Sequence, residues 1–479
     1  MEAGLPDNRL TRTEPAPKTG IVHLGLGAFF RGHGAIYTEE AIAASGGDWG
    51  IIGVSLQTPR MRDALEPQGG TYMAVELGPK PVPPRHVQVI DRVLVAPEDP
   101  QAVLDVMTDP AIRIVSLTVT EKGYCHEPAS GALNLTHPDI QHDIANPLPR
   151  SAPGFLVRAL QARRAAGHAP FTVQSCDNLP DNGRVARGVV LALAREIDPA
   201  LADWIGDEGR FPAAMVDRIV PATKPEDITA LREASGTYDA APVMHEPFRQ
   251  WVIEDDFVGG ARPDWAAVGA QMVEDIAAYE HMKLCMLNGT HSSLAYLGYL
   301  AGKDTIADTM ADPAFAAFVD HLWRAEIAPG LTPPEGVSLA DYAAALAERY
   351  RNPAIRHLTW QIAMDGSQKL PQRILGTVGE AMAAGRPCPG LILAIAAWMR
   401  YVGGVDEAGN PIDVRDPFSA ELKALSDSAE APDAKVAALL SLRAVFSAEQ
   451  AAALLAPVSK AYATLVEKGA KRALAEILS

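Results

Sequence analysis

The feature that most constrains the fold is an alternation, in the first half of the chain, of short apolar β-branched runs with helix-like stretches. The expected strands are GIVHLGLG (20–27), WGIIGVSLQ (49–57), RIVSLTVTE (113–121), FTVQSCDN (171–178) and AMVDRIVPA (214–222). Residues 154–167 and 183–197 show helical periodicity between them. Nearly continuous apolar strands require helices on both faces, so the alternation predicts an α/β domain with a parallel sheet.

The pattern changes near residue 275, after which Ala/Leu-rich helical periodicity continues with few β-branched runs to Ser479. A chain of 479 residues is long enough to bury more than one core. We therefore expect an N-terminal extension over 1–19, an α/β domain over 20–275, and a mainly α-helical C-terminal domain over 276–479.

The charge balance argues against a nucleic-acid partner. The chain has 42 Lys and Arg against 59 Asp and Glu, a formal charge of −17, and no basic cluster that would offset repulsion by a polyanion. Residues 1–19 lack the apolar stretch of a signal peptide, and no apolar run approaches the ~20 residues that span a bilayer. The sequence therefore predicts a cytoplasmic protein that binds neither nucleic acid nor membrane.

The cysteines give no sign of a metal site or a disulfide framework. They are Cys125, Cys176, Cys285 and Cys388, and none has CxxC or Cys/His spacing. We expect four reduced thiols and no structural zinc.

A glycine-rich turn follows the first expected strand, in HLGLGAFFRGH (23–33). Gly25 and Gly27 would allow a tight turn and a close approach of a pyrophosphate to backbone N–H groups at a helix start. Phe30 occupies the place of the third glycine of GxGxxG, so an ordinary strand-to-helix turn is an equally good interpretation. The candidate cofactor-binding residues are Gly25, Gly27, Ala28, Phe29, Phe30 and Arg31.

The segment after the next strand bears on the choice of cofactor. It reads SLQTPRMRD (55–63), without the acidic residue that commonly grips a ribose hydroxyl, and it contains Arg60 and Arg62. These arginines either accept a 2′-phosphate or face solvent, so the sequence leaves both NAD(H) and NADP(H) open.

The segment KLCMLNGTH (283–291) places polar side chains in an apolar, helix-like stretch. At about 100° per residue, an α-helix with Lys283 at 0° would have Glu280 near ~60°, His291 near ~80° and Asn288 near ~140°. All four then share one side, as in an active site, and the alternative is a solvated stripe ended by Asn-Gly.

Carbonyl reduction suits this set of groups. It needs a proton donor for the developing alkoxide and hydrogen bonds to its oxygen, and a lysine can serve if its pKa is lowered. Asn178, at the end of an expected strand in SCDNLPDNG, could supply a second amide, although an Asx turn is the commoner role for such a pair.

With these residues the sequence resembles the long-chain mannitol and polyol dehydrogenase family. KLCMLNGTH looks like the family's K-x-x-x-x-N-x-x-H signature, and further blocks follow in the same order from about residue 20 to the C-terminus. These blocks are GLGAFFRGH, VTEKGYC, SCDNLPDNG, MVDRIVPA and EPFRQWVIEDDFVGGARPDW. The glycine loop departs from the family's usual G-x-G-x-F-H-R-A-H, because Phe30 replaces the first histidine and Gly32 the alanine.

The resemblance implies a metal-independent, NAD(P)-dependent secondary-alcohol dehydrogenase with an N-terminal Rossmann-type domain and a helical C-terminal domain. It implies Lys283 as general acid/base, Asn178 and Asn288 as amides that stabilise the oxyanion, and His291 as a residue that orients substrate. Glu280 is implied near a proton path, and Asp217 and Lys369 at substrate-contacting positions. The partner is a small sugar acid or polyol. Oligomeric state is left open, and the family includes monomers.

Two positions look like the fructuronate-reducing branch of the family. Mannitol-oxidising members read TEGGYC and have an arginine eight residues before the lysine of DGSxK, whereas this chain has Lys122 and Gln361 there. A uronate carries a carboxylate, with which Lys122 or Arg373 could pair. The expected reaction is therefore reduction of D-fructuronate to D-mannonate. The alternatives are a mannitol 2-dehydrogenase activity and a catalytically silent nucleotide sensor.

Overall fold

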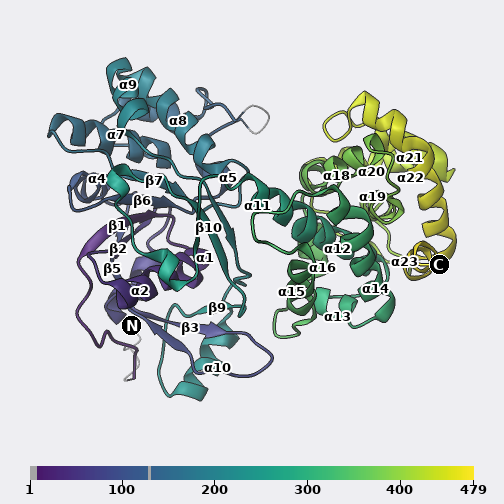
Figure 1. Ribbon diagram of the computed structural model, residues 1–479, viewed down its shortest axis with the longest axis horizontal. Helices are drawn as coiled ribbons and strands as arrows, with labels where there is room; N and C mark the ends of the chain where they lie inside the picture. Colours follow the sequence, from purple (N-terminus) through teal and green to yellow (C-terminus); the bar gives the residue numbers. More distant parts are fainter. Residues whose placement is uncertain (1–7, 128–130) are drawn as a thin grey trace, which may run out of the picture. The chain divides into compact units, whose positions relative to one another are not determined.

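The computed structural model describes residues 8–127 and 131–479, and the chain divides into two compact units, Met1–Ala277 and Ala278–Ser479 (Figure 1). Residues 8–18, the described part of the expected N-terminal extension, pack onto the first unit. Arg12, for example, donates side-chain hydrogen bonds to the backbone carbonyls of Gly69 at 2.7 Å and Gln88 at 2.6 Å. In the described part of the chain, no helix is long and apolar enough to cross a membrane.

A five-stranded parallel sheet forms the centre of the first unit. Its order is β5-β2-β1-β6-β7, and every neighbouring pair is parallel. The strands are β1 (Thr19–Leu24), β2 (Gly50–Ser55), β5 (Ile90–Val95), β6 (Ile114–Leu117) and β7 (Thr172–Ser175). Strands β2 and β5 therefore lie on one side of β1, and the chain then crosses over so that β6 and β7 lie on the other side. This confirms the predicted α/β class and creates a topological switch point between β1 and β6.

Both faces of this sheet are buried. Val22 and Leu24 of β1 pack in one apolar cluster with side chains of several helices, including Val103, Phe155 and Val189, while Ile21 packs in a second cluster with Trp251 and Trp265. The covering helices include α2 (Gly34–Ser45), α4 (Pro100–Thr108), α7 (Ala152–Ala165) and α8 (Asn182–Ile197). Alternate residues of a strand point to opposite faces, which explains why its sequence is apolar throughout.

One expected strand belongs to a different sheet. β8 (Ala214–Asp217) pairs antiparallel with β10 (Gln250–Glu254), which is also joined by β11 (Gln271–Val273). A further sheet contains β4 (Arg85–Val87), β3 (Tyr72–Glu76) and β9 (Val243–His245). The prediction that 214–222 joins the parallel sheet was wrong. The sequence of a short, fully buried strand does not indicate which strand it will pair with.

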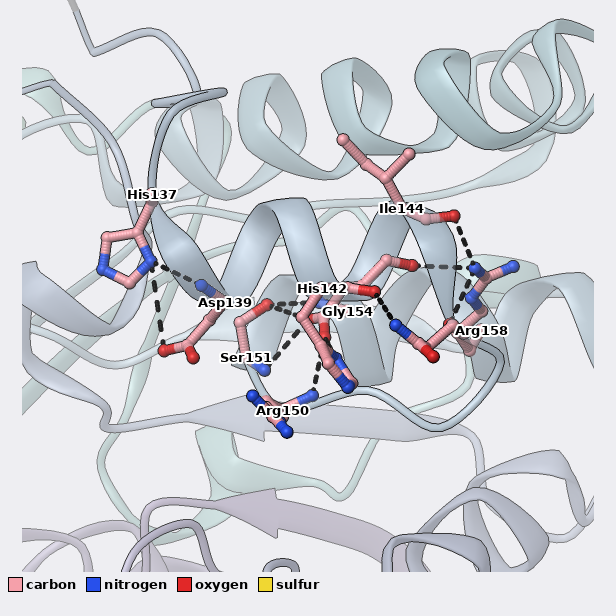
Figure 2. Close-up of polar contacts among 10 residues, drawn as sticks. His137, Asp139, His142, Ile144, Arg150, Ser151, Gly154 and Arg158 are labelled. Atoms are coloured by element: carbon pink, nitrogen blue, oxygen red, sulfur yellow. Dashed lines mark hydrogen bonds and ion pairs between the residues drawn. The ribbon is translucent and has the colours of Figure 1, made fainter.

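A buried carboxylate joins the end of α6 (Pro138–Ala145) to the start of α7 (Figure 2). Asp143 accepts hydrogen bonds from the backbone N–H groups of Arg150 and Ser151, at 2.8 and 3.0 Å, and from the Ser151 hydroxyl at 2.6 Å. A Cβ on Gly154 would lie 2.0 Å from this carboxylate. In return, the Arg158 guanidinium of α7 donates to three backbone carbonyls around the end of α6. Arg158 thus caps the C-terminal end of α6, while Asp143 holds Ser151, the N-cap residue of α7, whose hydroxyl accepts from the Gly154 N–H at 3.0 Å.

The second unit is helical, as predicted, and no β-strand was found in its residues, all of which the structure describes. Two buried helices, α12 (Thr290–Leu300) and α19 (Pro389–Val402), pack together in its centre. Around them lie α11 (Ala277–Met282), α15 (Leu339–Arg351), α16 (Thr359–Ala363), α17 (Gly366–Leu370), α18 (Gly376–Ala383) and α22 (Ala448–Lys468).

Three π-helical turns interrupt the α-helices of the second unit: η4 (Lys283–Gly289), η5 (Leu322–Ile327) and η7 (Pro371–Leu375). The prediction of a regular α-helix at 100° per residue through 283–291 was therefore wrong. A π-turn widens the helix and moves residue i+5 toward the face of residue i. This brings Asn288 closer to the face of Lys283 than an α-helix would.

Candidate active site

The glycine turn lies at the switch point of the parallel sheet. Gly25 has φ +89°, and a Cβ there would meet the Thr118 carbonyl oxygen at 2.2 Å, so the position requires glycine. The Thr118 hydroxyl donates to the carbonyl of Gly25 at 2.8 Å. The loops that follow β1 and β6 are thus held together where ligands bind in open α/β sheets.

The backbone beyond Gly25 fits a dinucleotide. Gly27 is exposed and extended, with φ −96° and ψ −176°, and it directly precedes α1 (Ala28–Gly32). A Cβ at Gly27 would meet only the Gly25 carbonyl oxygen, at 3.8 Å, so the space beside it is open. Ala28 and Phe29 are partly exposed at the start of the helix. Open backbone of this kind allows a phosphate to approach.

The side chains of Phe30 and Arg31 point into the protein. Phe30 stacks on His23 with ring centroids 3.3 Å apart, and the Arg31 guanidinium donates to the Ala241 carbonyl at 2.5 Å and lies over the Tyr72 ring. Any contact of these two residues with a cofactor would therefore come from their backbone.

The two arginines after β2 have different surroundings. Arg62 forms ion pairs with Glu98 and Asp63, whereas Arg60 is exposed and makes no ion pair within the described residues. Arg60 is consequently the better placed of the two to receive an added negative charge.

The loop that follows β7 is tied to the loop that follows β6 by one carboxylate. Asp177 accepts hydrogen bonds from the backbone N–H groups of Val119 at 3.0 Å and Thr120 at 2.8 Å, and from the Tyr124 hydroxyl at 2.8 Å. Burial raises the pKa of Asp177, and these hydrogen bonds oppose the rise. Asn178 is the next residue, and it is exposed at the carboxyl edge of the sheet.

The remaining candidates of the first unit lie on separate elements. Lys122 is exposed on the short helix α5 (Thr120–Gly123), which follows β6. Asp217 is 5% exposed at the end of β8, opposite Gln250, and so belongs to the β8–β10–β11 sheet instead of the parallel one.

The signature segment of the second unit is largely buried. Lys283 in η4 and His291 in α12 are each 7% exposed, so the alternative of a solvated stripe was wrong for these two residues. Asn288 and, on α11, Glu280 are partly exposed. A buried lysine is the type of group whose proton affinity an enzyme can adjust.

Side chains from distant helices bind the carbonyls of the π-turn. The Trp323 indole N–H donates to the Met286 carbonyl at 2.9 Å, and the Tyr350 hydroxyl donates to the Leu287 carbonyl at 2.8 Å. A buried backbone carbonyl without a partner would be costly, so these two contacts stabilise the irregular turn that carries Lys283 and Asn288.

Aromatic rings surround His291. Tyr350 stacks on it with centroids 5.1 Å apart at 16°, and His357 meets it edge-on at 4.5 Å and 75°. Burial, then neighbouring cationic groups, lowers the pKa of His291 well below its usual value and that of His357 to about 4. Both rings are therefore neutral at pH 7. No motif or periodic pattern in the sequence selects Tyr350 or His357.

The charges of three side chains act on these rings: Arg349 of α15, Lys369 and Arg373. Lys369 on α17 donates from Nζ to the carbonyls of Met364 at 2.5 Å and Ile362 at 3.3 Å, and burial lowers its pKa to about 8. Arg373 in η7 donates to the Ser292 hydroxyl at 3.1 Å. The two π-turns touch, since a Cβ on Gly289 would lie 2.7 Å from the Arg373 carbonyl oxygen.

Family models match both units. The mannitol dehydrogenase Rossmann domain covers residues 19–267, and the mannitol dehydrogenase C-terminal domain covers residues 275–466. The chain belongs to the mannitol dehydrogenase family. It is accordingly an oxidoreductase, as the resemblance implied.

Relatives within the mannitol dehydrogenase family match the whole chain. D-mannonate oxidoreductase of Escherichia coli (strain K12) is 46% identical, over 100% of this chain and 99% of the relative. A mannitol 2-dehydrogenase of Aspergillus clavatus is 41% identical, over 90% of this chain and 87% of the relative. Mannitol 2-dehydrogenase of Pseudomonas fluorescens, solved as a ternary complex with NAD and D-mannitol, has a TM-score of 0.86 at 38% identity, over 99% of this chain and 97% of the other.

Strained backbone in this family member lies beside the candidate residues. Among the described residues, the non-glycine positions with positive φ are Thr120, Cys125, Asp181 and Asp365. The first two flank Lys122, the third follows Asn178 by three residues, and the fourth precedes Lys369 by four. Such strain persists only where surrounding structure imposes it, and it is concentrated at functional sites.

Proposed function

We propose that this chain catalyses the NAD(H)-dependent reduction of D-fructuronate to D-mannonate, and the reverse oxidation. The observation that carries the proposal is the buried Lys283, held in a π-turn, in a chain 46% identical over its full length to a D-mannonate oxidoreductase. Lys122 and Gln361, at the two positions that differ from mannitol-oxidising members, support the sugar acid over the polyol.

The glycine turn is our candidate for the cofactor's pyrophosphate. Gly25 shapes the turn, and the open backbone from Gly27 to Arg31 would approach the phosphates. The bound nicotinamide supplies a hydride acceptor or donor. The exposed Arg60 makes NADPH a necessary comparison, because an arginine there could bind a 2′-phosphate.

Other side chains would transfer the proton, stabilise the developing oxyanion and orient the substrate. Lys283 donates a proton to the substrate oxygen during reduction and removes it during oxidation, with Glu280 on the path to solvent. The amides of Asn288 and Asn178 donate hydrogen bonds to that oxygen, which stabilises its developing charge. His291, Asp217 and Lys369 orient the substrate. We assign no metal to this reaction, as the resemblance to a metal-independent dehydrogenase family implies.

Mannitol 2-dehydrogenase activity is the second candidate. Relatives of that name are 41–42% identical, and the structure solved with NAD and D-mannitol has a TM-score of 0.86. This candidate uses the same lysine and amides but needs no group for a carboxylate. A silent nucleotide sensor is supported only by the altered glycine loop, and it would bind NADH without turnover.

Steady-state assays of NADH oxidation with D-fructuronate and D-fructose, each repeated with NADPH, test the proposal. We expect a kcat/KM for D-fructuronate at least about tenfold above that for D-fructose, the ratio that one charge-assisted contact supplies. A preference for D-fructose would establish the mannitol dehydrogenase alternative. Binding of NADH without turnover of either ketose would establish the sensor.

A further inference from the structure

Arg373 is a desolvated cation with no carboxylate partner in the described parts of the chain. Its guanidinium donates to the neutral hydroxyl of Ser292, and it forms no ion pair with any residue that the structure describes. Burial lowers its pKa, and the groups that oppose this are the phenols of Tyr296 and Tyr350, which are neutral at pH 7. A partly buried guanidinium without a counter-charge is unfavourable, so the position suits an anionic ligand.

The nearby Lys369 has a different environment. Its ammonium donates to two backbone carbonyls. Burial and then the charge of Arg373 lower its pKa to about 8, and the negative charges of Asp365 and Asp416 oppose this. Lys369 is therefore at least partly neutralised by its own neighbours. Arg373, in contrast, has no carboxylate among the described residues that raises its pKa.

Two histidine nitrogens near Arg373 are also buried without partners. Nε2 of His291 and Nδ1 of His357 make no hydrogen bond to any described residue. The charge of Arg373 acts on both rings, which places them in its vicinity. His291, 7% exposed, and the edge-on His357 thus present unused polar atoms beside an uncompensated cation.

We propose that Arg373 and His357 form a subsite for the carboxylate of a sugar-acid substrate, an inference that rests on the proposed function. A guanidinium presents parallel N–H donors that match a planar carboxylate, and a neutral imidazole can add one N–H donor. The Ser292 hydroxyl accepts one hydrogen bond from the guanidinium, at 3.1 Å. A polyol offers no charge to this subsite, so Arg373 and His357 determine specificity without taking part in proton transfer.

Lys122 is the competing carboxylate partner. It is exposed on α5 of the first unit, and an ion pair at an exposed lysine contributes little because water and salt screen it. The desolvated Arg373 would discriminate more strongly between charged and neutral substrates.

The test compares kcat/KM for D-fructuronate and for D-fructose in the full-length enzyme and its variants. We expect Arg373→Gln to lower the D-fructuronate value by roughly 30-fold or more, and to lower the fructuronate-to-fructose ratio by at least about tenfold. His357→Phe, which keeps an aromatic ring against His291, should lower the ratio by about threefold to tenfold. Arg472→Gln, at an exposed arginine of the same unit, is the matched control and should leave the ratio unchanged.

Direct binding separates this inference from the proposed function. D-mannonate, titrated into the NADH-loaded enzyme, forms a complex that cannot transfer hydride; it should bind the wild type and bind Arg373→Gln at least about tenfold more weakly, with D-mannitol affected less. If the wild type reduces D-fructuronate while both variants keep the wild-type ratio, the subsite is overturned and the proposed function stands. The subsite would also be overturned if Lys122→Gly lowered the fructuronate-to-fructose ratio while Arg373→Gln and His357→Phe left it unchanged. A wild type that neither reduces D-fructuronate nor binds D-mannonate overturns both.

Discussion

The ring of His357 meets the ring of His291 edge-on, with centroids 4.5 Å apart and an interplanar angle of 75°. The contact joins the loop before α16 to the helix that follows the signature lysine. Both imidazoles are buried near cationic side chains, so the folded protein holds them in the neutral form.

This pair should make the second unit sensitive to acid. His357 has a pKa of about 4 in the folded chain, against 6.5 for an unperturbed histidine. Between these values the unfolded chain binds more protons, so the free energy of unfolding falls as the pH is lowered from about 6.5 to about 4. His357→Phe removes this titration, so the acid-induced fall in the free energy of unfolding should be smaller in the variant by up to about 3 kcal/mol. Urea unfolding of wild type and variant across this pH range measures it, and parallel pH profiles would contradict the account.

The contact between the two π-turns leaves no room for a methyl group at Gly289. An added Cβ would lie 2.7 Å from the Arg373 carbonyl oxygen, which is backbone and cannot rotate away. Gly289→Ala should therefore lower the free energy of unfolding by about 1–3 kcal/mol and displace Lys283 or Arg373, with a fall in turnover.

Gly379→Ala is the matched control for this change. Gly379 is an exposed residue of α18, and a Cβ there would meet nothing within 4 Å. This variant should keep its activity and gain up to about 1 kcal/mol of stability, because alanine restricts the unfolded chain. Equal melting temperatures for Gly289→Ala and Gly379→Ala would contradict this prediction, because they would show that the two π-turns can move apart without a loss of stability.

The hydrogen bonds that Asp143 accepts from Arg150 and Ser151 should be important for the stability of the first unit. Asp143→Ala would leave the N–H groups of Arg150 and Ser151 and the Ser151 hydroxyl without their acceptor. We expect a loss of about 2–4 kcal/mol in chemical denaturation. Asp139→Asn, at a half-exposed carboxylate 3.9 Å from His137, should change stability by less than about 0.5 kcal/mol. If Asp139→Asn lowered the free energy of unfolding as much as Asp143→Ala, the loss of a negative charge, and not the loss of the Asp143 hydrogen bonds, would be responsible.

The parallel sheet could be predicted because its strands are apolar on both faces. Ile21 and Val22 enter different clusters, and that alternation is visible as a continuous apolar run. β8 could not be placed in the same way. Its four buried residues fit any sheet, and the partner that decides its position, β10, lies far along the chain.

The π-turn at 283–289 could not be predicted from the sequence, for a related reason. It is stabilised by the distant Trp323 and Tyr350, which bind carbonyls of the turn from 37 and 63 residues away. Local periodicity therefore drew attention to the polar residues of the signature, but an α-helix gives the wrong angles between them. His357 lies in an irregular loop, where no periodic pattern could mark it.

Lys283 is the residue on which the proposed chemistry depends, and the turnover of Lys283→Met tests that claim most directly. We expect kcat for D-fructuronate reduction to fall by about 100- to 10,000-fold, the range typical of a lost general acid, while the dissociation constant for NADH stays within about twofold. Circular dichroism would confirm that the variant is folded. Turnover within about threefold of wild type, or a loss of NADH affinity as large as the loss of turnover, would contradict the assignment of Lys283 as the acid–base group.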